Sequence, residues 1–158
     1  DHTANSANGQ WGEITFPTFR LGEIYLNFIE AVLECKIRGV NIPANYYTKA
    51  MEVWQELRAR VALPSITESY PHADDNELLD LCRKERRVEL ALESERFFDL
   101  VRWGEAAEVL NKFYAEEAAD CTIYTNASFT KNKNEYLPIP FAQMSASNGN
   151  YTQNCGNW

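Results

Sequence analysis

The sequence predicts an all-α protein in which paired helical hairpins are followed by a loop-rich C-terminal tail. Apolar residues recur at steps of three and four between residues 20 and 114, which is the period of one face of a helix. Beyond residue 117 this period stops, and Asn, Thr, Ser, Pro and Gly predominate. With 158 residues, the chain is long enough to bury one hydrophobic core.

Composition divides the chain into three segments. Residues 1–16 are small and polar, which predicts a flexible lead-in with Trp11 as its first anchor. Residues 17–117 form the predicted helical region, and residues 118–158 form the loop-rich tail. We expect four apolar residues to pack the tail onto the helices: Tyr136, Leu137, Ile139 and Phe141.

The first two helices form a predicted hairpin. The first helix covers residues 20–38 and ends at Gly39, and the second covers residues 47–61. The second must stop before Pro64, because the residue preceding a proline avoids the helical conformation. The short loop between the helices predicts antiparallel packing. The expected apolar stripes are Leu21, Ile24, Tyr25, Phe28, Ile29, Val32 and Cys35 on the first helix, and Tyr47, Met51, Trp54, Leu57 and Val61 on the second.

A connector over residues 64–73 leads to the third helix, which we expect to begin at Asp74 or Asp75. Asp74 and Glu77 have the spacing of a capping box, in which carboxylates accept from the free amides of the first turn. After a break near Ser94, a fourth helix is expected from Phe97 to between Tyr114 and Glu117. The third helix is predicted to bury Leu78, Leu81, Cys82, Val88 and Leu92. The two helix pairs are similar in size, as in tetratricopeptide-like arrays.

Charge and composition exclude several classes of protein. The chain has 23 acidic and 15 basic residues and a net charge of −8, whereas nucleic-acid-binding proteins cluster Lys and Arg. No run of eighteen apolar residues predicts a membrane-spanning helix. The first ten residues lack the pattern of a signal peptide. Because the chain does not begin with Met, we expect a processed product or part of a longer protein.

The cysteines and histidines do not have the spacing of a metal site. The four cysteines are separated by 47, 39 and 34 positions, and the histidines are His2 and His72. No CxxC or HxxxH spacing occurs, so neither a metal site nor a cofactor is expected. Cys35 and Cys82 are predicted to be small buried residues on helices. Cys121 and Cys155 lie in loop segments and are either free or paired in a disulfide.

The densest feature is residues 74–105, in which ten acids and six bases occupy half of the positions. On a helix, Glu85, Glu89 and Glu93 form one row at four-residue steps, which is unfavourable unless bases lie between them. The bases are present on the same segment and, as Arg58 and Arg60, on the second helix. We therefore predict a structural ion-pair network between helices. Its members are Glu85, Arg86, Glu89, Glu93, Arg96, Asp99 and Arg102.

A second interpretation of the same carboxylates is a glycosidase. Glu85 and Glu89 have a spacing at which two carboxyl groups can flank a glycosidic bond. Such a pair needs unequal environments, however, and the many arginines nearby favour the ionised form of every acid. We therefore assign no catalytic residue. Aromatic side chains outside the apolar stripes are a further candidate for stacking on sugar rings, although each is more often a core or lid residue. They are Trp11, Tyr46, Tyr70, Tyr114, Tyr124 and Trp158.

Four blocks carry a resemblance to a known family. They are RLGEIYLN at residues 20–27 with Glu30 and Ala31 after it, LRARV at 57–61, ERRVELALE and RFFDLVRWG within 85–104, and YLPIP at 136–140 followed by Gln153 and Asn154. In this order they resemble the SusD/RagB family, the cell-surface nutrient-binding lipoproteins of Bacteroidetes. The resemblance covers residues 20–156 and corresponds to the C-terminal part of a longer family member. Ser94 stands where members commonly have Gly, and Cys155 stands where Pro usually follows the closing Gln-Asn.

The resemblance implies a fold of tetratricopeptide-like helix pairs, tethered by an N-terminal lipid absent from this fragment to the outer leaflet of the outer membrane and exposed at the cell surface. It also implies a SusC-like TonB-dependent transporter as partner, to which the protein delivers oligosaccharides or peptides. In that setting the four blocks act mainly as scaffold. Because the family's ligand contacts lie largely outside this part of the chain, no ligand-binding residue is carried over.

Three hypotheses for the function follow. The leading one is a non-enzymatic glycan-binding module of a SusD-like protein, and a neutral sugar as cargo is consistent with the exclusion of nucleic acid. The second is a tetratricopeptide-like scaffold that binds a protein and no sugar. The third is the glycosidase, which predicts that turnover is lost on substituting Glu85 or Glu89.

Overall fold

The structure is a computed structural model that describes residues 19–118 and 120–154. Over these ranges the chain is all-helical, as predicted, with seven α-helices, one short 3-10 helix and no strand. It divides into two compact units, one ending at Leu90 and one beginning at Ala91, and each is described by itself. The predicted lead-in over residues 1–16, with Trp11, lies outside the described residues.

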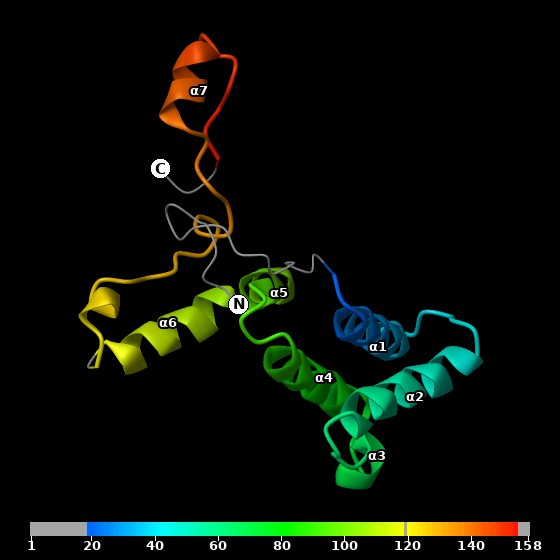
Figure 1. The fold of residues 1–158 in the computed structure, drawn as a ribbon. Helices are drawn as coiled ribbons and strands as arrows, with labels where there is room; N and C mark the ends of the chain where they lie inside the picture. Colours follow the sequence, from blue (N-terminus) through cyan, green and yellow to red (C-terminus); the bar gives the residue numbers. More distant parts are fainter. Residues whose placement is uncertain (1–18, 119, 155–158) are drawn as a thin grey trace, which may run out of the picture. The chain divides into compact units, whose positions relative to one another are not determined.

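The first unit contains α1 (Leu21–Ile37), α2 (Asn45–Ala59), α3 (Ile66–Ser69) and α4 (Asp75–Glu89). Figure 1 shows α1 in blue beside α2 and α4, and α1 packs against both. The short α3 packs on α2. Trp54 of α2 is fully buried and is the largest side chain of the core. The core is formed by Leu26, Ile29, Val32, Leu33, Ala50, Val53, Trp54, Leu57, Ile66, Leu78, Leu79, Cys82 and Leu90.

The buried face of α1 differs from the predicted stripe. Leu21 and Ile24 are exposed, whereas Leu26 and Leu33 are fully buried. The face that packs on α2 and α4 is therefore centred on Leu26, Ile29 and Leu33, and it also carries the carboxylate of Glu30. Choosing a stripe by apolar residues alone missed this face, because a charged residue lies within it. The helix ends as predicted, with Gly39 in the left-handed conformation at a φ of 67°.

Two capping boxes fix the segment between α2 and α4. The predicted box at the start of α4 is confirmed, since Asp74 accepts from the amide of Glu77 while Glu77 accepts from the amide of Asp74. A second box, formed by Ser65 and Glu68, starts α3 within what was predicted to be a plain connector. The backbone amide and hydroxyl of Ser65 hold the pKa of Glu68 below its ordinary value.

The second unit contains α5 (Glu95–Trp103), α6 (Ala106–Glu117), the 3-10 helix η1 (Thr122–Tyr124) and α7 (Phe141–Ala146). The predicted break near Ser94 is confirmed, because α4 ends at Glu89 and Ser94 has a φ of 67°. The prediction of one continuous fourth helix is wrong. Gly104, at a φ of 77°, ends α5 and separates it from α6.

The predicted anchoring of the tail is wrong for three of its four residues. Tyr136, Leu137 and Phe141 are exposed, and of the four only Ile139 is half-buried. A different tail residue, Phe129, is buried in a small core against α5 and α6. Its backbone donates to and accepts from the side-chain amide of Asn111, so one amide holds the tail to α6.

Val88 and Leu92 are also exposed, against the prediction that they belong to the buried face of the third helix. Val88 lies in the last turn of α4, and Leu92 lies in the turn that follows it, at a φ of 67°. For Leu92 the reason is that the helical period cannot place a residue beyond the point where the helix ends.

Ser94 gives a direct test of the break between α4 and α5. The left-handed conformation costs an L-residue about 1–2 kcal/mol, and glycine is free of most of this cost. Ser94→Gly should therefore raise the free energy of unfolding by about 0.5–1 kcal/mol after the larger unfolded-state entropy of glycine is counted. Urea denaturation followed by circular dichroism measures this change.

The control is the same exchange inside a helix. Ser145 lies in α7 and is exposed, so Ser145→Gly should lower stability through the poor helix propensity of glycine. Equal losses from both exchanges would show that Ser94 is not strained.

Candidate functional site

The predicted charged network falls into two parts. Glu85, Arg86 and Glu89 lie on α4 in the first unit. The other four residues lie in the second unit, Glu93 in the turn before α5 and the rest on α5 itself: Glu93, Arg96, Asp99 and Arg102. The contacts of each part within its own unit are as follows.

The most buried pair of charges joins α1 and α4. Arg86 is 3% exposed and Glu30 is 4% exposed, and the Nε of Arg86 lies 3.7 Å from the Oε2 of Glu30. The guanidinium of Arg86 also donates to the Oδ1 of Asn27 at 2.6 Å. With little water at this depth, the charges depend on one another for solvation, which makes the loss of either partner costly.

A second pair ties the end of α2 to α4. The Nη1 of Arg58 donates to the Oε2 of Glu85 at 2.7 Å, and its Nε donates to the carbonyl of Pro64 at 2.7 Å. A longer bond, at 3.4 Å, reaches the hydroxyl of Ser69 at the end of α3. One buried arginine therefore fixes α2, the following turn, α3 and α4 relative to each other.

Glu89 is the last residue of α4, and it lies between two arginines that flank two other helices. Arg20, just before α1, reaches its Oε1 at 2.6 Å and also donates to its backbone carbonyl. Arg60, just after α2, reaches both carboxylate oxygens at 2.6 and 2.7 Å. A Cβ on Gly22 would lie 2.6 Å from the Nη1 of Arg20 and 2.9 Å from the Oε1 of Glu89, so this ion pair occupies the space that only glycine leaves open.

In the second unit, Asp99 is 4% exposed and accepts from the Nε and Nη2 of Arg102 at 3.1 and 2.9 Å. The guanidinium groups of Arg96 and Arg102 lie 5.4 and 5.0 Å from the centre of the Trp103 ring. These are cation–π contacts, and they hold the last turn of α5 together with the ion pair.

Sequence reasoning expected Arg58 and Arg60 to lie near the row of glutamates, and in the structure they form ion pairs with Glu85 and Glu89. It missed three partners on or just before α1, namely Arg20, Asn27 and Glu30, because they lie 56 to 69 positions from Arg86 and Glu89 along the chain. One signal was available. A glutamate at residue 30 lies one position after Ile29 and three before Leu33, within a buried helical face that requires a partner for it.

The arrangement offers no acid–base pair. Catalysis by two carboxyl groups requires one protonated and one ionised group in unequal surroundings. Glu85 and Glu89 instead both accept hydrogen bonds from guanidinium groups. Within the described ranges, no group of three or more His, Cys, Asp or Glu could hold a metal ion. Cys121 is a free, half-buried thiol in the structure, and its proposed partner Cys155 lies outside the described residues.

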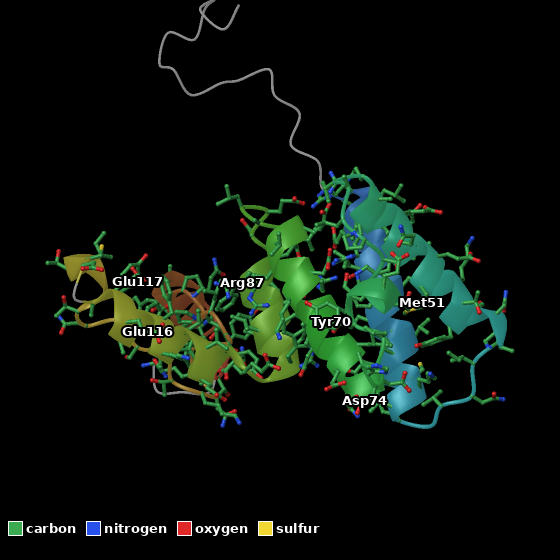
Figure 2. All side chains as sticks on the ribbon, turned by 90° about the horizontal axis from the view of Figure 1, so that it is seen from below. Met51, Tyr70, Asp74, Arg87, Glu116 and Glu117 are labelled. Atoms are coloured by element: carbon green, nitrogen blue, oxygen red, sulfur yellow. The ribbon has the colours of Figure 1, made fainter. Side chains whose placement is uncertain are left out.

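The open clefts of the first unit include three that lie between or beside its described helices. The cleft at the connection from α3 to α4 has a volume of about 510 Å³ and includes Tyr70, which is labelled in Figure 2. A cleft of about 500 Å³ lies between α2 and α3 and includes Met51. A third, of about 360 Å³, lies beside the Arg20–Glu89 pair. All three fall in the size range of small-molecule sites.

These features define a helical scaffold protein whose buried charges join its helices. The chain belongs to the SusD family, because the family model matches residues 1–158. Members of this family are surface lipoproteins of the outer membrane that bind glycans for nutrient uptake, work with SusC-like transporters and are generally non-enzymatic. No curated protein matches the chain. Among the helices in the described part of the chain, none is both long and apolar enough to cross a membrane.

Substituting Arg86 tests whether the buried charges hold the first unit. Arg86→Ala leaves the carboxylate of Glu30 buried without this guanidinium, which should lower the free energy of unfolding by about 3–5 kcal/mol. Arg87→Ala is the matched control, since this neighbouring arginine is exposed and should change stability by less than about 0.5 kcal/mol. Chemical denaturation compares the two variants, and similar small effects would contradict the structural role of Arg86.

Gly22 tests the packing of the Arg20–Glu89 pair. Alanine favours a helix over glycine by about 1 kcal/mol, so Gly22→Ala should stabilise the chain once Arg20 and Glu89 have both been replaced by alanine. In the native background the new methyl group must displace the ion pair, so the gain should be reduced or reversed. Equal stabilisation in both backgrounds, measured by urea denaturation, would mean that the pair does not occupy this space.

Proposed function

We propose that this chain is part of a non-enzymatic surface lipoprotein that binds oligosaccharides and delivers them to a SusC-like TonB-dependent transporter in the outer membrane. The observation that carries the proposal is membership of the SusD family over the whole chain. The described residues supply a helical scaffold, since Glu85, Arg86 and Glu89 of α4 form ion pairs with residues on or next to α1 and α2.

The glycosidase hypothesis has little support from the site. Both candidate carboxylates are tied to arginines, and Arg58, the partner of Glu85, is itself buried beneath the turn after α2. Their role in the proposal is to position helices. Glu85→Gln and Glu89→Gln should therefore lower stability and leave no turnover to lose.

The experiment is isothermal titration calorimetry of the full-length protein with a panel of neutral oligosaccharides, followed by a test of co-purification with a SusC-like transporter from the same cells. We expect saturable binding of at least one glycan, without release of hydrolysed product over hours. Failure with every glycan, together with co-purification of the transporter, would favour the tetratricopeptide-like scaffold that binds protein alone. Turnover abolished by Glu85→Gln or Glu89→Gln would instead establish the glycosidase.

A further inference from the structure

The two sides of α4 use their charged residues differently. On the side that faces α1 and α2, Glu85, Arg86 and Glu89 all bond to other helices. On another side, Asp80 and Lys84 are exposed, and neither bonds to another residue that the structure describes. They lie four residues apart, so they occupy one row on the helix surface.

This row forms one wall of the largest of the three clefts. The other wall is the five-residue connection from α3 to α4, which contributes Tyr70 and His72. Tyr70 is 47% exposed, and Leu81 of α4, which is half-buried, also lines the cleft. The cleft therefore combines an accessible aromatic face, an apolar floor and polar groups that have no partner within the described residues.

The connection is held in place from both ends. The amide of Tyr70 donates to the carbonyl of Ile66, and the amide of Ala73 donates to the carbonyl of Tyr70. The capping box of Asp74 and Glu77 then fixes the start of α4. Because the wall that carries Tyr70 is ordered before any ligand arrives, a ligand would bind there with little cost of ordering the protein.

We infer that this cleft, formed by Tyr70, His72, Asp80 and Lys84, is a binding subsite for a neutral saccharide unit. A sugar ring presents an apolar face to an aromatic ring and hydroxyl groups to its edge. Tyr70 supplies the ring, and Asp80 and Lys84 supply an acceptor and a donor for the hydroxyl groups. Two carboxylates, those of Glu77 and Asp80, against the one ammonium of Lys84 disfavour an anionic ligand. The inference rests on the proposed function and adds to it the location of one sugar-binding subsite on this chain.

The test titrates the protein with maltose, cellobiose, xylobiose and mannobiose, and with digalacturonate as the anionic comparison. Binding is followed by calorimetry and by amide chemical shifts of the ¹⁵N-labelled protein. We expect at least one neutral disaccharide to shift the amides of residues 70, 72, 73, 80 and 84, and digalacturonate to bind at least fivefold more weakly. Tyr70→Ala should weaken the binding of that disaccharide at least tenfold, and Asp80→Ala at least threefold.

Tyr151→Ala is the matched control, since Tyr151 is exposed to a similar degree, 55%, and lies in the other unit. It should leave the affinity unchanged. Asp80 is on the helix surface, so its variant keeps the test valid even if Tyr70→Ala perturbs the connection. Glycan binding that is unaffected by both cleft variants overturns the subsite and leaves the proposed function standing. If none of the glycans binds, long oligosaccharides included, the proposed function is overturned as well.

Discussion

Arg86 and Glu30 place opposite charges between α1 and α4, at a depth where each is at most 4% exposed. Transfer of either charge alone to this position would cost several kcal/mol, so the pair forms only when the two helices meet in one register. Asn27 adds a neutral acceptor to the same guanidinium. Further ion pairs of the first unit, at Glu85 and Glu89, attach α2 and the chain before α1 to the same helix, α4.

Helix periodicity and local capping rules predicted most of the fold. The helix ended by Gly39, the capping box at Asp74 and the break near Ser94 all depend on residues close together in sequence, and all three are present. The two errors in helix boundaries share one cause, which is that the apolar period does not mark these boundaries. Gly104 divides a segment whose apolar period continues across it, and α3 is only four residues long, too short for a period to be read.

The site was less predictable, because its contacts are long-range. Local spacing indicated the pair of Asp99 and Arg102, which are three residues apart on one helix. Nothing local indicates that Arg20 reaches Glu89. Gly22, at the second position of α1, leaves open the space that this ion pair occupies. Burial in the tail could not be predicted either, because sequence pattern alone cannot rank the aromatic residues of a loop by burial. Phe129 is buried and Phe141 is not.

The central claim is that Glu85 and Glu89 of α4 join helices through their ion pairs with arginines. A double-mutant cycle on Arg58 and Glu85 tests it most directly, with Arg58→Met, Glu85→Leu and the double variant compared with the native protein by urea denaturation. Because the two side chains meet at 2.7 Å in a largely buried position, we predict a coupling free energy of about 1–3 kcal/mol. A coupling within about 0.3 kcal/mol of zero would mean that these charges do not hold α2 to α4, and would contradict the account.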